Sequence, residues 1–172
     1  MDLLDFDPGE LYFEKQDSPE VQELIQQAGT EYENGEAELP LLQAFMRAPE
    51  SLNVLVALNR FYYYQHRLSE ALLISEKALE IIRSKLQFPG DWHTLELQTI
   101  TQAPKEQFSW VRLYLFTLKS IGFVKMRLHE LETSKAIFEK LVALDSEDRI
   151  GASGLLKLVN RKIDENSNLF HI

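Results

Sequence analysis

The side chains that could perform catalysis or bind a metal ion are scattered along this sequence. The four histidines, at positions 66, 93, 129 and 171, show none of the spacings by which imidazoles share a metal ion or serve a nucleophile. The sequence also lacks a glycine-rich phosphate loop, a GxSxG nucleophile motif and an HExxH zinc motif. These patterns predict a protein that is not an enzyme and that binds no metal ion or cofactor.

One short stretch, Asp91-Trp92-His93, places a carboxylate, an aromatic ring and an imidazole next to one another. It follows Pro89-Gly90, a strong turn signal, so an exposed surface turn explains it as well as a binding site does. The competing interpretation is an enzyme or small-molecule binder that uses residues 87–104, including Trp92 and His93, as a lid.

The run Phe61-Tyr62-Tyr63-Tyr64 offers ring faces instead of reactive groups. Four consecutive helical residues are spread over about 300° of the helix circumference, so these rings cannot all face one core. Some of them are therefore available for contacts outside the core, where aromatic faces suit peptides and cations.

Composition narrows the class of protein. The chain has 172 residues, of which 45% are apolar and 26% are charged, as in ordinary soluble globular domains. It contains no cysteine, which excludes disulfides and thiolate chemistry. No apolar run approaches the roughly 18 residues of a membrane helix, and the acidic start differs from a secretory signal. We therefore expect a cytoplasmic protein that has no membrane partner.

The net charge of −9 is unevenly distributed. Residues 1–50 hold 13 Asp and Glu against 2 Lys and Arg, whereas residues 51–172 hold 14 against 16. The chain lacks the basic footprint that nucleic-acid binding requires, so no nucleic-acid partner is expected. The acidic front either aids solubility or meets a basic surface, on a partner or on the chain's own second part.

Apolar residues that recur every three or four positions predict the helices that position these groups. Ser18 suits the N-cap of the first helix, and Pro19 suits its first position because that N–H has no partner in any helix. A weak alternation over 94–101 indicates a short extended piece. The predicted helices cover about 18–35, 36–47, 51–86 as two helices joined at 65–69, 104–128, 131–144 and 147–163.

Residues 51–86 resemble a tetratricopeptide repeat, a helix–turn–helix unit of 34 residues. The resemblance rests on Leu55, Leu58, Tyr62, Ala71, Ala78 and Leu79, with Arg67-Leu68-Ser69-Glu70-Ala71 as the turn into the second helix. Ala37 and Ala44 precede Ala71 and Ala78 by 34 residues each, so they indicate a degenerate first repeat. Gly122 matches a position of the third repeat at which neighbouring helices touch. The resemblance implies an all-α, TPR-like solenoid of helical hairpins with a C-terminal capping helix.

The predicted domain organisation follows from this pattern. An acidic N-terminal arm over 1–17 precedes a TPR-like domain over 18–163, and a tail over 164–172 ends the chain. Within the domain we predict repeats at about 18–50, 51–86 and 105–146, an insertion over 87–104 and a capping helix over 147–163.

The resemblance further implies a non-enzymatic adaptor or chaperone that binds a segment of a protein or peptide partner in a concave groove. Cations would attract acidic groups of the partner, and aromatic rings would supply contact area. A partner, the acidic arm or the insertion could each occupy this groove, and a structural oligomeric subunit is a further alternative. In the repeat register, the predicted binding residues are Asn53, Arg60, Tyr63, Tyr64, Lys119, Phe123 and Arg127, and the first-repeat equivalents include Gln22 and Gln26.

Overall fold

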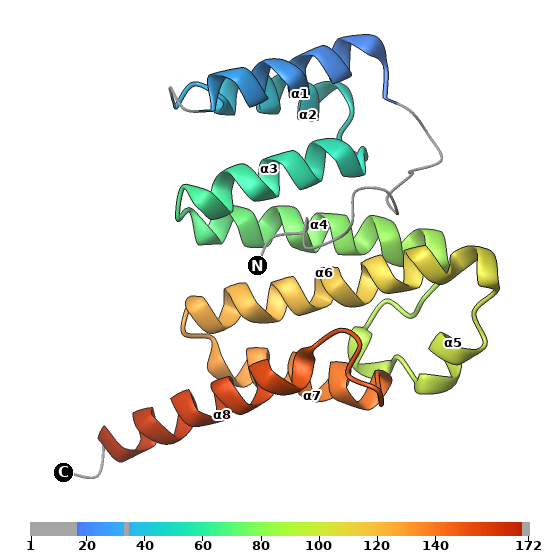
Figure 1. Ribbon diagram of the computed structural model, residues 1–172, viewed down its shortest axis with the longest axis vertical. Helices are drawn as coiled ribbons and strands as arrows, with labels where there is room; N and C mark the ends of the chain where they lie inside the picture. The colour runs from blue at the N-terminus through green and yellow to red at the C-terminus, as the bar shows by residue number, and fades with distance from the viewer. Residues whose placement is uncertain (1–16, 33–34, 170–172) are drawn as a thin grey trace. The chain divides into compact units, whose positions relative to one another are not determined.

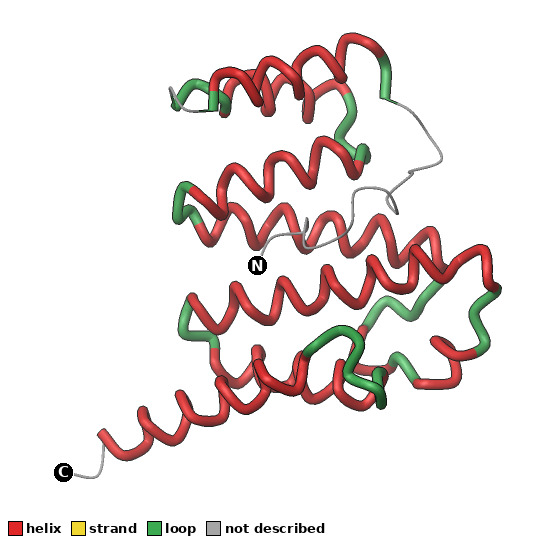
Figure 2. The backbone as a smooth tube through the Cα atoms, viewed as in Figure 1, coloured by secondary structure: helices red, strands yellow, loops and turns green. Residues whose placement is uncertain are grey.

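The computed structural model describes residues 17–32 and 35–169 (Figures 1 and 2). The described residues form eight α-helices and two short 3-10 helices, and no β-strand occurs among them. This arrangement confirms the all-α prediction. The extended piece predicted over 94–101 is wrong, because Leu97–Thr101 forms the short helix α5. Apart from Asp17, the predicted acidic arm lies outside the described residues.

The chain divides into two compact units, Met1–Ile81 and Ile82–Ile172. The boundary falls inside α4 (Leu68–Leu86). The predicted domain over 18–163 therefore includes parts of both units.

The first unit contains α1 (Pro19–Glu31), α2 (Glu38–Arg47), α3 (Leu52–Tyr64) and the start of α4. As predicted, Ser18 caps α1, where its hydroxyl accepts a hydrogen bond from the Val21 N–H at 3.4 Å. Helix α1 packs on α2, and α2 packs on α3. Small buried residues let these backbones approach closely, and they include Ala28, Ala37, Ala44 and Ala71.

A tight turn joins α3 to α4. His66 adopts the left-handed conformation, with φ of 58°. Its N–H donates to the Tyr63 carbonyl at 3.1 Å, and the Arg67 N–H donates to the Tyr62 carbonyl at 2.9 Å. These two bonds pair the last carbonyls of α3 and end the helix at the predicted place. Between the two helices, the buried Asn59 amide donates to the Ala71 carbonyl at 2.8 Å and to the Ser75 hydroxyl at 2.7 Å.

The second unit contains the end of α4 and the segments that follow it. These are the 3-10 helices η2 (Trp92–Thr94) and η3 (Lys105–Gln107), and the helices α5, α6 (Phe108–Arg127), α7 (Leu131–Leu144) and α8 (Ala152–Leu169). Twelve of the 20 residues of α6 are buried, in agreement with apolar residues on nearly every side of this helix. It contacts both α7 and α8.

Gly122 allows α6 and α7 to touch. A Cβ atom at this position would lie 2.9 Å from side-chain atoms of Ile137 and Phe138, closer than carbon atoms normally approach. The Ser134 hydroxyl donates to the Gly122 carbonyl at 2.7 Å across the same contact. The close approach therefore depends on the missing side chain.

The final helix differs from its prediction at both ends, since α8 covers Ala152–Leu169 instead of about 147–163. Two carboxylates organise the preceding turn. The Asp145 carboxylate accepts from the Ile150 N–H at 2.6 Å, and the Asp148 carboxylate accepts from the Ser153 N–H at 3.0 Å. These bonds hold residues 145–151 in a non-helical loop, which delays the start of α8.

Candidate peptide-binding groove

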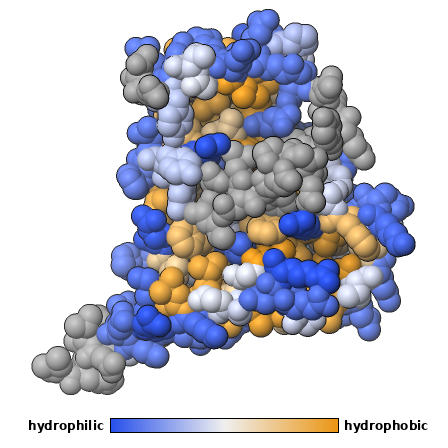
Figure 3. Space-filling model, in the orientation of Figure 1, coloured by the Kyte–Doolittle hydropathy of each residue, from blue (hydrophilic) through white to orange (hydrophobic). Residues whose placement is uncertain are grey.

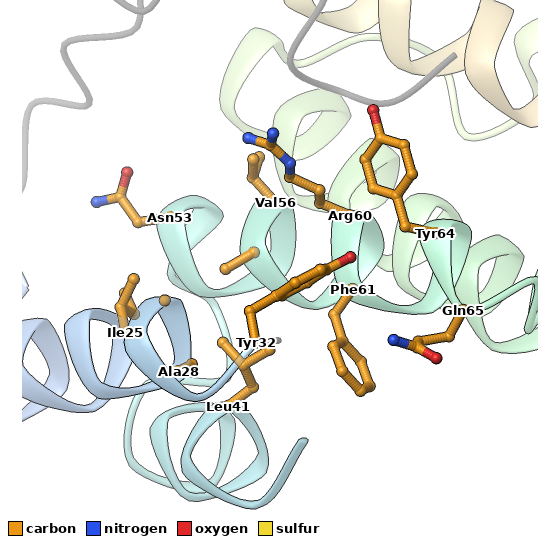
Figure 4. A pocket seen from close by; sticks show the side chains of 12 residues that line it. Ile25, Ala28, Tyr32, Leu41, Asn53, Val56, Arg60, Phe61, Tyr64 and Gln65 are labelled. Atoms are coloured by element: carbon orange, nitrogen blue, oxygen red, sulfur yellow. The ribbon is translucent and has the colours of Figure 1, made fainter. Parts of the chain in front are cut away.

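A cavity of about 700 Å³ lies within the first unit, mainly between α1 and α3 (Figure 4). In Figure 3, apolar surface is visible between the polar outer sides of these two helices. We call this cavity the α1/α3 groove. Among the described residues, 12 line it: Ile25, Ala28, Gly29, Tyr32, Leu41, Asn53, Val56, Ala57, Arg60, Phe61, Tyr64 and Gln65.

Helical spacing brings the lining residues to one place. On α3, Asn53, Val56, Arg60 and Tyr64 follow one another at intervals of three or four residues, so they share a helix face. Figure 4 shows Val56, Arg60 and Tyr64 projecting from the same side of α3. On α1 the same spacing applies to the lining residues from Ile25 to Tyr32. Two helix faces therefore form the walls of the groove.

The groove combines an apolar surface with a few polar groups. Aliphatic and aromatic side chains from α1 and α3 make most of its wall, and Arg60 is the only charged residue among the 12 that line it. The Arg60 guanidinium carbon lies 5.7 Å from the ring centroid of Tyr64, whose side chain is 52% exposed. An apolar wall with one cation suits a segment that carries both apolar side chains and a carboxylate.

The end of the N-terminal arm is attached at the rim of this groove. The Asn53 amide donates a hydrogen bond to the Asp17 carboxylate at 2.8 Å. The Gln22 amide donates to the Asp17 backbone carbonyl at 2.8 Å. Asp17 therefore lies beside Asn53, at the N-terminal end of α3.

The groove unites three of the seven predicted binding residues, Asn53, Arg60 and Tyr64. Tyr63 is not among the lining residues. One step along a helix turns the side chain by about 100°, and Tyr63 packs half-buried against the core of the first unit. Its ring meets the ring of Tyr64 edge to face, with centroids 5.5 Å apart. The cavity therefore does not include Tyr63, whose binding role stays a prediction.

The prediction for Lys119 is corrected, because Lys119 is a buried residue of α6 that is only 3% exposed. Its ammonium group donates to the Ile150 carbonyl at 2.7 Å and lies 4.5 Å from the ring centroid of Phe116. It therefore serves the loop before α8 instead of facing a partner. The other two predicted residues of α6 are Phe123, which is half-buried, and Arg127, which is exposed. Their binding role stays a prediction.

The sequence did not identify the α1 side of the groove. The repeat register predicts Gln22 and Gln26 on this side, whereas the lining residues are Ile25, Ala28, Gly29 and Tyr32. Ile25, Ala28 and Tyr32 lie at the three- and four-residue spacing that is typical of a core face. An apolar helix face can be shared between a core and a cavity, and periodicity alone does not separate the two.

A charged cluster connects α2 to the turn between α3 and α4. The Arg67 guanidinium lies 2.8 Å from the carboxylates of both Glu38 and Glu70, and 4.6 Å from the ring centroid of Tyr62. Burial and the neighbouring Glu38 raise the pKa of the Tyr62 phenol. The hydrogen bond from Arg67 lowers the pKa of Glu70. The cluster links α2 to the turn that follows α3, the helix that carries one wall of the groove.

The Asp91-Trp92-His93 stretch forms an exposed turn in the second unit. The His93 Nδ1 atom lies 2.7 Å from an Asp91 carboxylate oxygen, and the ring of Trp92 stacks on that of His93 at 3.5 Å. The His93 backbone N–H and its ring lower the pKa of Asp91. Both side chains of the pair are about 60% exposed, at 59% for His93 and 61% for Asp91. This exposure fits the surface-turn interpretation.

Two other kinds of site, a metal centre and a membrane-spanning helix, do not occur among the described residues. Residues 17–32 and 35–169 contain no group of three or more His, Asp or Glu side chains placed to hold a metal ion. Within the same residues, no helix is both long and apolar enough to cross a membrane.

Comparison with known proteins identifies a relative. The chain is 40% identical over 159 residues to the "Uncharacterized 19.8 kDa protein in nifW 5'region" of Azotobacter chroococcum mcd 1. The match covers 92% of this chain and 89% of that protein. No family model and no solved structure matches the chain.

Proposed function

The chain belongs to the same family as this Azotobacter chroococcum protein, and we propose that it is a non-enzymatic protein-interaction module, an adaptor or chaperone. It binds an extended or helical segment of a protein partner in the α1/α3 groove. The observation that carries the proposal is the groove itself, because two helix faces present a continuous apolar wall together with the exposed cation Arg60.

Correspondences between the two hairpins support a TPR-like architecture as part of this proposal. His66 and His129 are 63 residues apart, and both adopt a left-handed conformation directly after a helix. Asn59 and Gly122 are also 63 residues apart, and each lies at the crossing of its own hairpin. Such internal similarity is the mark of a repeated helix–turn–helix unit.

The mechanism of capture follows from the lining residues. Apolar side chains of the partner would cover Ile25, Val56 and Ala57, and the release of water from this wall would supply most of the binding free energy. Arg60 would pair with a carboxylate of the partner, and the neighbouring Tyr64 ring would add contact area. The predicted cation Lys119 takes no part, since it is buried against the loop before α8.

The test is affinity capture from a lysate of the source organism with the wild-type chain and two variants. Arg60→Glu reverses the only charge among the lining residues, and Arg161→Glu makes the same change at an exposed position of α8. A partner retained by the wild type and Arg161→Glu, but lost from Arg60→Glu with unchanged helicity, is the expected result.

Loss of a partner from both variants, or retention by both, would contradict a groove that depends on Arg60. The binding surface would then have to be sought elsewhere, beginning with Phe123 and Arg127 of α6.

A further inference from the structure

We propose that the chain's own acidic N-terminal segment, residues 1–16, docks in the α1/α3 groove as an internal ligand that a partner must displace. The juxtaposition behind this proposal is the attachment of Asp17 to Asn53 at one end of the groove. The proposal concerns the regulation of the site proposed above, and it rests on that function.

The attachment fixes where the segment begins. Two amides hold Asp17, that of Asn53 on its carboxylate and that of Gln22 on its backbone carbonyl, each at 2.8 Å. Asn53 is itself a lining residue of the groove. The preceding residues are therefore tethered directly beside an apolar groove.

The length of the segment matches the groove. From Asn53 to Tyr64, α3 advances by roughly 16 Å at 1.5 Å per residue. An extended chain covers about 3.3 Å per residue, so roughly five residues before Asp17 are enough to pass the whole length of the groove. Those positions hold Tyr12 and Phe13, with Leu11 next to them.

The chemistry of the segment is complementary to that of the groove. Residues 1–17 hold six acidic side chains against one lysine, together with the apolar run Leu11-Tyr12-Phe13. The groove holds an apolar wall and a single charge, the cation of Arg60. Apolar side chains can cover the wall while a neighbouring carboxylate, such as Glu14 or Glu10, pairs with the guanidinium.

Tethering makes a weak interaction sufficient. A short linker gives an effective concentration on the order of 1 mM, so a segment with an intrinsic Kd of about 0.1 mM would be docked roughly 90% of the time. A competing partner would then bind about tenfold more weakly than it binds an unoccupied groove. Only a partner that binds the groove tightly enough to compete with the docked segment would displace it.

A cysteine placed in the groove reports on its occupancy in the full-length chain. The sequence has no native cysteine, and a Cβ atom at the lining residue Gly29 would meet nothing within 4 Å, so Gly29→Cys fits without strain. The measurement is the rate at which a water-soluble maleimide modifies this thiol. We expect Tyr12→Ser/Phe13→Ser to increase the rate by roughly tenfold, as release from about 90% occupancy requires.

A matched thiol controls for general effects. Gly154 of α8 also has no neighbour within 4 Å of an added Cβ. The thiol of Gly154→Cys should therefore be modified at the same rate whether the segment is wild type or carries Tyr12→Ser/Phe13→Ser. If Gly29→Cys lowers helicity, Gln65→Cys at the far end of the groove replaces it.

Equal modification rates in the presence of either form of the segment would overturn the proposal. They would leave the proposed function intact wherever a partner is still captured through Arg60. The modification rate could instead rise tenfold while no captured partner depends on Arg60. That result would show that the segment docks in the groove, and it would refute the proposed interaction function.

Discussion

At the scale of single residues, Lys119 shows how burial changes the role of a charge. On the sequence it resembles a cation that faces a partner, but its ammonium group is enclosed beside Phe116 and donates to the Ile150 carbonyl. A buried ammonium group is costly unless it is hydrogen-bonded, so this contact is structural in character. Lys119 belongs to the connection between α6 and the loop before α8.

Replacing Lys119 by methionine tests this role. Lys119→Met keeps the length of the side chain but leaves the buried Ile150 carbonyl without its donor, so the free energy of unfolding should fall by about 1–3 kcal/mol. Urea denaturation followed by circular dichroism measures the change. Lys157→Met, at an exposed position of α8, is the control and should alter the free energy little. An unchanged stability for Lys119→Met would refute the structural role.

Asp148 provides a residue whose contribution depends on pH. The Ser153 hydroxyl and backbone N–H donate to its carboxylate and lower its pKa. Because the pKa is lower in the folded state, the stabilisation is complete above the unfolded pKa of about 3.9 and is lost as the pH falls through the folded value. The stability difference between wild type and Asp148→Asn should therefore be constant near pH 7 and diminish in acid. Denaturation curves recorded from about pH 7 to about pH 2 test it, and a difference independent of pH would contradict it.

At the scale of elements, helix boundaries were predictable where the controlling interaction is local. Ser18 and Pro19 predict the start of α1 because an N-cap bond spans only three residues. Lys119 could not be assigned from the sequence, because its partner Ile150 is 31 residues away in a loop. The groove was predictable on α3, but its α1 side was missed because an apolar helix face looks the same whether it covers a core or a cavity.

The contact between α6 and α7 leads to a paired prediction. Gly122→Ala would place a methyl group 2.9 Å from Ile137 and Phe138, both fully buried, so we expect a loss of about 1–3 kcal/mol in the free energy of unfolding. Gly154→Ala in α8 meets nothing within 4 Å and should stabilise the chain by up to about 1 kcal/mol, since alanine favours helix. Thermal and urea unfolding compare the two. Equal changes in stability at both positions would show that helix propensity, and not the contact of Gly122 with α7, determines the effect.

At the scale of the whole molecule, the distribution of charge matters more than the net value of −9. The acidic residues are concentrated in residues 1–50, and the α1/α3 groove of the first unit presents the cation Arg60. Attraction between such exposed charges acts over about a Debye length, so it should respond to ionic strength. Apolar contacts in the groove should strengthen or change little as the ionic strength rises.

Salt therefore separates the two contributions to docking of the N-terminal segment. Raising the ionic strength from about 0.01 M to about 1 M shortens the Debye length from about 30 Å to about 3 Å. The thiol of Gly29→Cys should then be modified faster in the otherwise native chain, because the acidic segment leaves the groove more often. Gly154→Cys, measured under the same conditions, corrects for the effect of salt on the reagent. A corrected rate that does not change with salt would show that Arg60 contributes no electrostatic attraction to the docking.

In the repeat register proposed above, Asn59 of α3 corresponds to Gly122 of α6. The two hairpins use these positions in opposite ways, which limits how their parts can be recombined. In the first hairpin a larger residue on the leading helix, Asn59, faces the small Ser75, whereas in the second Gly122 faces the large Phe138. A chimera of α3 with α7 would bring Asn59 against Phe138, and a chimera of α6 with α4 would leave a void between Gly122 and Ser75. Each hairpin therefore has to be inherited, exchanged or redesigned as a matched pair of helices.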